Sequence, residues 1–112
     1  MSRSAKRTAT HVHIGRMVKR IVKEFDPEQI ILFGSHARGE AGRDSDVDLL
    51  VVMAFEGAAR DKGLEIMLAL NDRLVPVDVI VTRPEDFAWR KDVVGTIEWP
   101  AAREGKVLYA RP

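Results

Sequence analysis

The sequence predicts an α/β fold: a short mixed sheet with helices packed mainly on one face and the other face open enough to admit a substrate. Short apolar runs at residues 29–33, 47–53 and 77–81 have the length and composition of buried strands. Segments at 14–25 and 56–74 show the apolar spacing of amphipathic helices. We therefore expect these strands to form the sheet and the helices to cover one side of it.

Length and composition limit the class of protein. The chain has 112 residues, of which 46% are hydrophobic, so we expect one small domain over 1–112 with a flexible stretch at 1–9. It has no cysteine, which excludes disulfides and thiolate metal sites. No apolar run approaches the roughly 18–20 residues that span a bilayer, and the N-terminus lacks the apolar core of a signal peptide. These features predict a cytoplasmic protein without membrane contact.

Charge is unevenly distributed along the chain. Residues 1–23 hold seven Lys and Arg and no acid, a net charge of +7. Residues 24–112 hold eleven basic and seventeen acidic residues, a net charge of −6. The basic segment either contacts nucleic acid or an acidic partner, or forms a solvated helix face. Direct binding of nucleic acid therefore stays open.

The first helix is predicted over residues 14–25. Its apolar residues recur at the spacing that builds one buried helix face: Ile14, Met17, Val18, Ile21, Val22 and Phe25. Thr8 or Thr10 is expected to cap its start, and Asp26 to mark its end. A buried strand at 29–33 and a brief helical turn at 35–40 should follow.

The second half of the chain is predicted to begin with a helix at 56–74. The residues that should form its buried side are Leu64, Met67, Leu68 and Leu70, with Ile66 widening it. After the strand at 77–81, a further apolar stripe predicts another buried helix face: Val93, Val94, Ile97 and Ala101. Pro100 must break or kink that helix, and Gly105 should end it. Residues 107–109 are expected to form a closing strand or an extended tail.

The residues that carry chemistry gather between positions 33 and 52. An apolar run ends in Gly34-Ser35, a polar loop follows, and the next apolar run opens with Asp46-Val47-Asp48. Alternate side chains of a strand share a face, so Asp46 and Asp48 should point the same way. Neighbouring carboxylates repel each other, and a divalent cation such as Mg²⁺ would neutralise them. The alternative interpretation is a solvated turn before an ordinary strand.

A glycine turn and a third acid favour the metal site. Gly34 lets backbone approach a ligand closely, and successive N–H groups in such a turn can bind a phosphate. Asp78 is the one charge in the apolar run 77–81. Because the Asp46 and Asp48 pair is present, we interpret Asp78 as a third metal ligand rather than a member of a structural ion pair. Together these residues predict a metal–nucleotide site.

These residues also resemble a known signature. Gly34-Ser35, ten intervening residues and Asp46-Val47-Asp48 are similar to the signature of the DNA polymerase β-like nucleotidyltransferase superfamily. The longer string from Gly-Ser-His-Ala-Arg-Gly to Ser-Asp-Val-Asp-Leu-Leu-Val resembles its minimal nucleotidyltransferase (MNT) branch. The resemblance implies the polymerase β-like nucleotidyltransferase fold over 1–112. It also supports Asp78, since the third acid of the family lies on the following strand.

The motif and the resemblance together imply a two-metal nucleotidyl transfer from ATP. Two Mg²⁺ ions would be held by three catalytic carboxylates: Asp46, Asp48 and Asp78. The phosphates of the nucleotide would be bound by a second group of residues: Gly34, Ser35, Arg38 and Arg43. Asp78 would also help to take the proton of the acceptor hydroxyl.

The resemblance further implies a partner. Minimal nucleotidyltransferases are typically paired with a helical HEPN protein in prokaryotic toxin–antitoxin systems. The chain would then be a type VII-like antitoxin, a protein adenylyltransferase that moves AMP from ATP to a tyrosine hydroxyl of a HEPN toxin, and a hetero-oligomer is expected. Two alternatives stay open: an antitoxin that neutralises its toxin by binding alone, and a transferase that acts on a small molecule such as an antibiotic.

Overall fold

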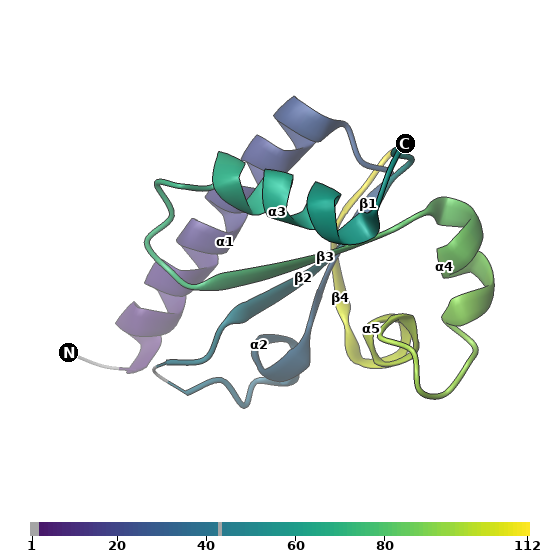
Figure 1. Ribbon diagram of the computed structural model, residues 1–112. Helices are drawn as coiled ribbons and strands as arrows, with labels where there is room; N and C mark the ends of the chain where they lie inside the picture. The colour runs from purple at the N-terminus through teal and green to yellow at the C-terminus, as the bar shows by residue number, and fades with distance from the viewer. Residues whose placement is uncertain (1–2, 43) are drawn as a thin grey trace.

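The computed structural model describes residues 3–42 and 44–112, and its four strands form one mixed sheet in the order β3-β2-β1-β4 (Figure 1). The strands are β1 (Gln29–Phe33), β2 (Val47–Val52), β3 (Val77–Thr82) and β4 (Lys106–Ala110). Strand β1 pairs antiparallel with β2 and with β4, whereas β2 and β3 are parallel. The helices are α1 (Arg3–Phe25), α2 (Gly34–Arg38), α3 (Ala59–Ala69), α4 (Pro84–Arg90) and α5 (Glu98–Glu104). The predicted α/β fold with a short mixed sheet is confirmed.

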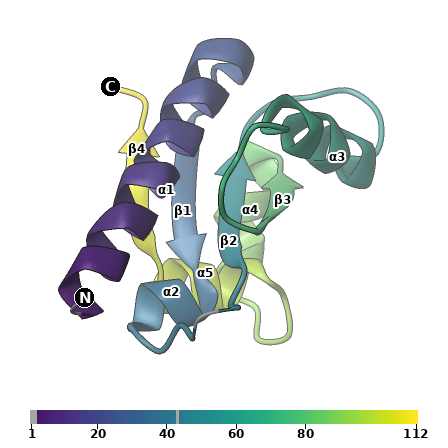
Figure 2. The same ribbon diagram turned by 90° about the vertical axis from the view of Figure 1, so that its left-hand side faces the viewer.

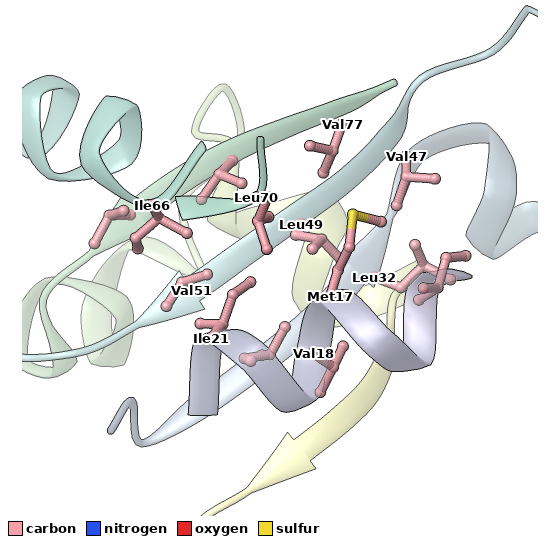
Figure 3. Packing of buried hydrophobic residues seen from close by; sticks show 14 of the residues in the cluster. Met17, Val18, Ile21, Leu32, Val47, Leu49, Val51, Ile66, Leu70 and Val77 are labelled. Atoms are coloured by element: carbon pink, nitrogen blue, oxygen red, sulfur yellow. The ribbon is translucent and has the colours of Figure 1, made fainter. Parts of the chain in front are cut away.

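One face of the sheet is covered by α1 and α3, which lie side by side in front of the strands in Figure 2. The apolar stripe predicted for α1 packs here, and Ile21 is fully buried. Ile66 of α3 meets the same cluster, together with Leu49 of β2 (Figure 3). Burial of these side chains is the main stabilising contribution, at about 25 cal/mol per Å² of apolar surface. This face is therefore the principal core.

The opposite face has a smaller apolar cluster, formed by Ile31, Phe33, Leu50 and Ala101. Helices α4 and α5 lie behind the sheet on this side (Figure 2). The hydroxyl of Thr82 at the end of β3 donates a hydrogen bond to the buried carboxylate of Glu98 in α5, at 2.8 Å. Because side chains alternate along a strand, the acidic positions of β2 and β3 fall on this second face.

Helix α1 begins earlier than the sequence pattern predicted. It starts at Arg3, so neither Thr8 nor Thr10 begins it. The segment between Arg3 and Ile14 contains no glycine or proline that would interrupt a helix. The helix therefore continues through both threonines, and neither hydroxyl marks its start. In the described part of the chain, no helix is long and apolar enough to cross a membrane.

Helix α3 is shorter than predicted, and its buried side is different. It spans Ala59–Ala69, and the exposed fractions of Leu64 and Leu68 are 47% and 73%, so the prediction that both are buried is wrong. Ile66 and Leu70 are buried as expected. The cause is Gly63, whose missing side chain lets α3 approach the Val79 carbonyl and so sets the rotation of the helix.

The predicted apolar helix face beginning at Val93 is also wrong. Residues 91–97 form consecutive turns, and Val93, Val94 and Ile97 are exposed. The Thr96 hydroxyl closes these turns, since it lies 2.7 Å from the carbonyl oxygen of Arg90 and 2.8 Å from that of Val93.

Pro100 neither breaks nor kinks a helix, because it occupies the third position of α5, where a backbone N–H has no partner within the helix. The closing strand is confirmed as β4.

The contact at Gly63 predicts opposite effects for two glycine substitutions in helices. A Cβ atom at Gly63 would lie 2.9 Å from the carbonyl oxygen of Val79, whereas one at Gly15 in α1 would meet nothing within 4 Å. Gly63→Ala should lower the free energy of unfolding by about 1–2 kcal/mol, because overpacking outweighs the gain in helix propensity. Gly15→Ala should raise it by about 0.5–1 kcal/mol. Urea denaturation of both variants checks this, and equal effects would contradict the packing of α3.

Candidate active site

Two of the predicted aspartates lie on the second face of the sheet, at the end where β1 finishes and β2 and β3 begin, and the third lies just ahead of β2. Asp48 of β2 is the register partner of Asp78 in the parallel strand β3, so the two side chains point to the same face. Asp46 lies two residues before Asp48, just ahead of β2. Asp48 is half-buried, and Asp46 and Asp78 are exposed to solvent. The structure thus places Asp48 beside Asp78, with Asp46 near enough for its charge to act on Asp48, and the role of the three as metal ligands stays a prediction.

Gly34 forms the turn beside these acids. It follows the last residue of β1 and has a φ of 73°, a left-handed conformation that glycine adopts without steric cost. A Cβ atom here would overlap the Oδ2 atom of Asp48 and lie 3.2 Å from its Cγ atom. The absence of a side chain at Gly34 therefore makes the space that the Asp48 carboxylate occupies. Ser35 follows and is half-buried at the start of α2.

The loop between α2 and β2 is held by a contact that sequence reasoning did not assign. The Nε2–H group of His36 donates to the carbonyl oxygen of Ser45 at 3.1 Å. The Ser45 hydroxyl in turn accepts a hydrogen bond from the backbone N–H of Gly42 at 2.9 Å. These bonds fix the residue before Asp46, so His36 is a positioning residue for the acids. In the sequence, the only indication of this positioning role was the place of His36 directly after Gly34-Ser35.

The guanidinium group of Arg38 is paired with two carboxylates. Its Nε atom lies 3.3 Å from Glu40, and its Nη1 atom lies 3.6 Å from Glu104 of α5. The positive charge of Arg38 nevertheless acts on Asp48: His36 and Arg38 both lower the pKa of that carboxyl. Binding of a nucleotide phosphate by Arg38 stays a prediction. Arg43, the other arginine predicted to bind phosphate, lies outside the described residues.

The electrostatics of the site favour a cation. Burial is the largest cause that raises the pKa of Asp48 above 3.8, followed by the negative charges of Asp78 and Asp46. Among the residues that the structure describes, none of the three acids has an ion pair or hydrogen bond with another side chain. Carboxylate oxygens are the donors that Mg²⁺ prefers. The donor set therefore fits a divalent cation of this kind.

The acids alone do not enclose a metal ion. No group of three His, Cys, Asp or Glu side chains in residues 3–42 and 44–112 is gathered closely enough to hold one. This fits Mg²⁺, which protein sites usually bind through one or two carboxylates together with water and substrate phosphates. Asp78 also lines a cavity of about 470 Å³ between α3 and β3, whose other walls include Leu64, Met67 and Ile80. Space for a second, largely apolar group therefore lies next to Asp78.

The raised pKa of Asp48 predicts how stability depends on pH in the metal-free protein. A carboxyl whose pKa is higher in the folded chain stabilises the fold fully below its ordinary value of 3.8, and this contribution is lost as the pH rises through the raised pKa. In EDTA, the wild type should therefore lose stability relative to Asp48→Asn as the pH rises above about 4. Thermal unfolding at several pH values measures this, and a constant difference in Tm would contradict it.

A mixed sheet that carries acids on adjacent strands beside a glycine turn is typical of the class of proteins that transfer nucleotidyl groups. The sequence model of the nucleotidyltransferase domain matches residues 16–100, and the chain belongs to this family. This finding confirms the family resemblance seen in the sequence. Comparison with curated proteins finds no match.

Solved structures share the fold across most of the chain. A candidate nucleotidyltransferase from Sulfolobus solfataricus is 22% identical, with a TM-score of 0.68 over 99% of this chain and 91% of that one. A toxin–antitoxin structure with AMP-PNP is 20% identical, with a TM-score of 0.55 over 87% of this chain and 73% of that one. A variant of the MntA-HpeT toxin–antitoxin is 19% identical, with a TM-score of 0.59 over 86% and 71%.

Proposed function

We propose that the protein is a Mg²⁺-dependent adenylyltransferase that moves AMP from ATP to a hydroxyl group of a partner protein in the cytoplasm. The observation that carries this proposal is the placement of Asp48 and Asp78 on one sheet face beside the turn at Gly34, with the charge of Asp46 acting on Asp48. In the reaction, the acceptor oxygen forms a bond to the α-phosphorus of ATP. The bond from that phosphorus to pyrophosphate breaks, and the hydroxyl proton is released.

The three acids have different surroundings, which support different roles. Asp48 is half-buried and feels the charges of both other acids, which supports a role as the central ligand of the proposed metal site. Asp78 is exposed and is one of the residues that line the cavity at α3 and β3, which supports the proposal that it holds the acceptor-side ion and receives the hydroxyl proton. Divalent cations bound here would neutralise phosphate charge and lower the pKa of the acceptor hydroxyl.

The turn after β1 supports binding of the triphosphate. Gly34 adopts a positive φ directly beside the Asp48 carboxylate, and Ser35 follows with a hydroxyl that has no hydrogen-bond partner among the described residues. In this proposal both groups contact the β and γ phosphates of ATP, and they set the orientation of the α-phosphorus relative to Asp48. Arg38 contributes positive charge from α2.

The proposed acceptor is a tyrosine of a HEPN-type toxin, with this chain as its antitoxin. The support is the resemblance of the motif to the minimal branch of the superfamily, together with the fold shared with two toxin–antitoxin structures. The cavity beside Asp78 has an apolar wall of Leu64, Met67 and Ile80, which suits an aromatic ring. In this proposal a tyrosine ring fills the cavity and presents its hydroxyl to Asp78.

Mass spectrometry of the partner tests this function. The purified chain is incubated with ATP, Mg²⁺ and the helical protein encoded by the neighbouring gene. One or more AMP groups on a tyrosine are expected, together with loss of toxicity. If the complex neutralises the toxin with no mass gain, the chain is a binding antitoxin and the proposed transfer is wrong. If a small molecule such as an aminoglycoside gains AMP instead, the acceptor assignment is wrong.

A further inference from the structure

A second concave surface lies on the face of the sheet opposite the acids, between α1 and the segment that follows α3. This groove has a volume of about 400 Å³. Five of its lining side chains carry a permanent positive charge: Arg16, Lys19, Arg20, Lys23 and Arg73. Asp72 is the only acidic residue among those that line it. The proposed nucleotide transfer makes no use of this surface.

Two of the arginines build the groove. Arg20 binds the Asp72 carboxylate through both of its terminal nitrogens, at 2.8 and 3.2 Å, and donates to the carbonyl oxygen of Ala69 at 3.1 Å. Arg73 donates to the carbonyl oxygen of Leu70, at the end of α3, at 2.9 Å. The Arg20 bonds join α1 to the end of α3, and they leave no unpaired acid among the lining residues. The groove is thus a defined structure with a positive surface.

The other three cations have no such partners. Arg16, Lys19 and Lys23 are exposed, and in the part of the chain that the structure describes they form no ion pair or hydrogen bond. They lie three, four and seven positions apart, so they share one side of α1 with Arg20. Like charges at these spacings destabilise a helix by about 0.2–0.5 kcal/mol per pair. A solvated helix face normally mixes signs, whereas this one excludes acids in a chain that is elsewhere acidic.

Apolar side chains complete the groove. Met17 and Leu70 are buried at its base, and Leu74 at its rim is 74% exposed. From Arg16 to Lys23 the cations extend about 10 Å along the helix axis, a length that covers a pair of successive phosphates of a nucleic-acid strand. Phosphates next to cations and unstacked bases against apolar side chains are the two contacts that single strands make with proteins.

We propose that this groove binds single-stranded nucleic acid, with the phosphodiester backbone along Arg16, Lys19 and Lys23 and a base against Leu74. The binding is independent of sequence, because the contacts are made by flexible side chains and no base-reading element faces the groove. It does not depend on nucleotide transfer, since the acids lie on the other face of the sheet.

Fluorescence anisotropy with a labelled single-stranded RNA tests the proposal in the full-length protein. The test variant is Arg16→Ala with Lys23→Ala. The control variant is Arg60→Ala with Lys106→Ala, which removes the same two charge types from exposed positions elsewhere. The test variant should bind at least about tenfold more weakly at low salt. The slope of log K against log salt concentration should be less steep by about 1.4 in this variant, because each of the two lost phosphate contacts contributes about 0.7. The control should match the wild type in slope.

Several outcomes would overturn the proposal. No binding of RNA by the wild type at low salt would refute it directly. Equal losses in the test and control variants would show that only net charge matters. Equal binding of polyglutamate would identify a general surface for acidic proteins, and equal binding of duplex RNA would exclude the base contact at Leu74. Single-stranded DNA is expected to bind as well as RNA, because both present the same phosphates. A marked preference for RNA would show recognition of the 2′-hydroxyl and contradict backbone binding alone.

Discussion

Asp48→Asn is expected to reduce nucleotidyl transfer by about 10³-fold or more while the fold remains intact. Asp48 is half-buried, it aligns in register with Asp78, and the charges of Asp78 and Asp46 both act on it. Asparagine has nearly the same shape but carries no negative charge, so a cation bound there would lose its central ligand. A loss of about 4 kcal/mol in transition-state stabilisation corresponds to this factor. Steady-state transfer of labelled AMP to the partner measures it.

Thermal unfolding separates this effect from a loss of structure. Because the charged form of Asp48 is disfavoured by burial and by the two neighbouring acids, Asp48→Asn should unfold at an equal or higher temperature than the metal-free wild type. Addition of Mg²⁺ and ATP should raise the Tm of the wild type and not that of the variant. Asp44→Asn, at an exposed position in the same loop, is the matched control and should retain full transfer. Wild-type activity in Asp48→Asn would exclude the proposed metal role.

Gly34→Ala should have the second large effect, and Gly39→Ala provides a close control. The two glycines begin and follow α2 with almost equal φ angles of 73° and 74°. A Cβ atom at Gly34 would overlap the carboxylate of Asp48, whereas one at Gly39 would meet nothing within 4 Å. Both variants should lose about 1 kcal/mol of stability from the left-handed backbone. Gly34→Ala should lose a further 1–3 kcal/mol, roughly, because Asp48 must move.

The same pair of variants distinguishes a functional turn from a structural one. Calorimetry with a nonhydrolysable ATP analogue and Mg²⁺ should show weak or undetectable binding to Gly34→Ala and ordinary binding to Gly39→Ala. Transfer activity should follow the same order. An unchanged dissociation constant in Gly34→Ala would show that the turn does not form part of the phosphate site. Equal losses of stability would show that Asp48 adjusts without cost.

The strands of the sheet and the face of Asp48 could be predicted from local sequence. Apolar runs of five to seven residues at 29–33, 47–53 and 77–81 become β1, β2 and β3 with boundaries that shift by at most one residue. The period of two along a strand is a property of the backbone, so Asp48 had to share a side with Leu50 once β2 formed, whereas Asp46 lies ahead of the strand. Gly34 could be predicted as a turn for a similar reason, because few other residues adopt a positive φ.

Other features depend on contacts between residues far apart in the chain. The rotation of α3 follows from the approach of Gly63 to Val79, and it exposes Leu64 and Leu68 although their spacing suits a buried helix face. The turns at 91–97 are closed by the Thr96 hydroxyl, a bond that competes with helix formation. The contact between His36 and Ser45 likewise joins residues nine positions apart.

The sequence alone determined the strand and helix segments that make an α/β fold, the glycine turn at Gly34, and the position of Asp48 at the start of β2, because each depends on a local pattern of residues. Tertiary structure decided that Asp78 lies level with Asp48, that α3 turns Leu64 toward a cavity beside Asp78, and that α1 forms a positive groove with Arg73. These depend on strand register and helix packing. Each is set by the total free energy of many distant contacts, which no local pattern contains.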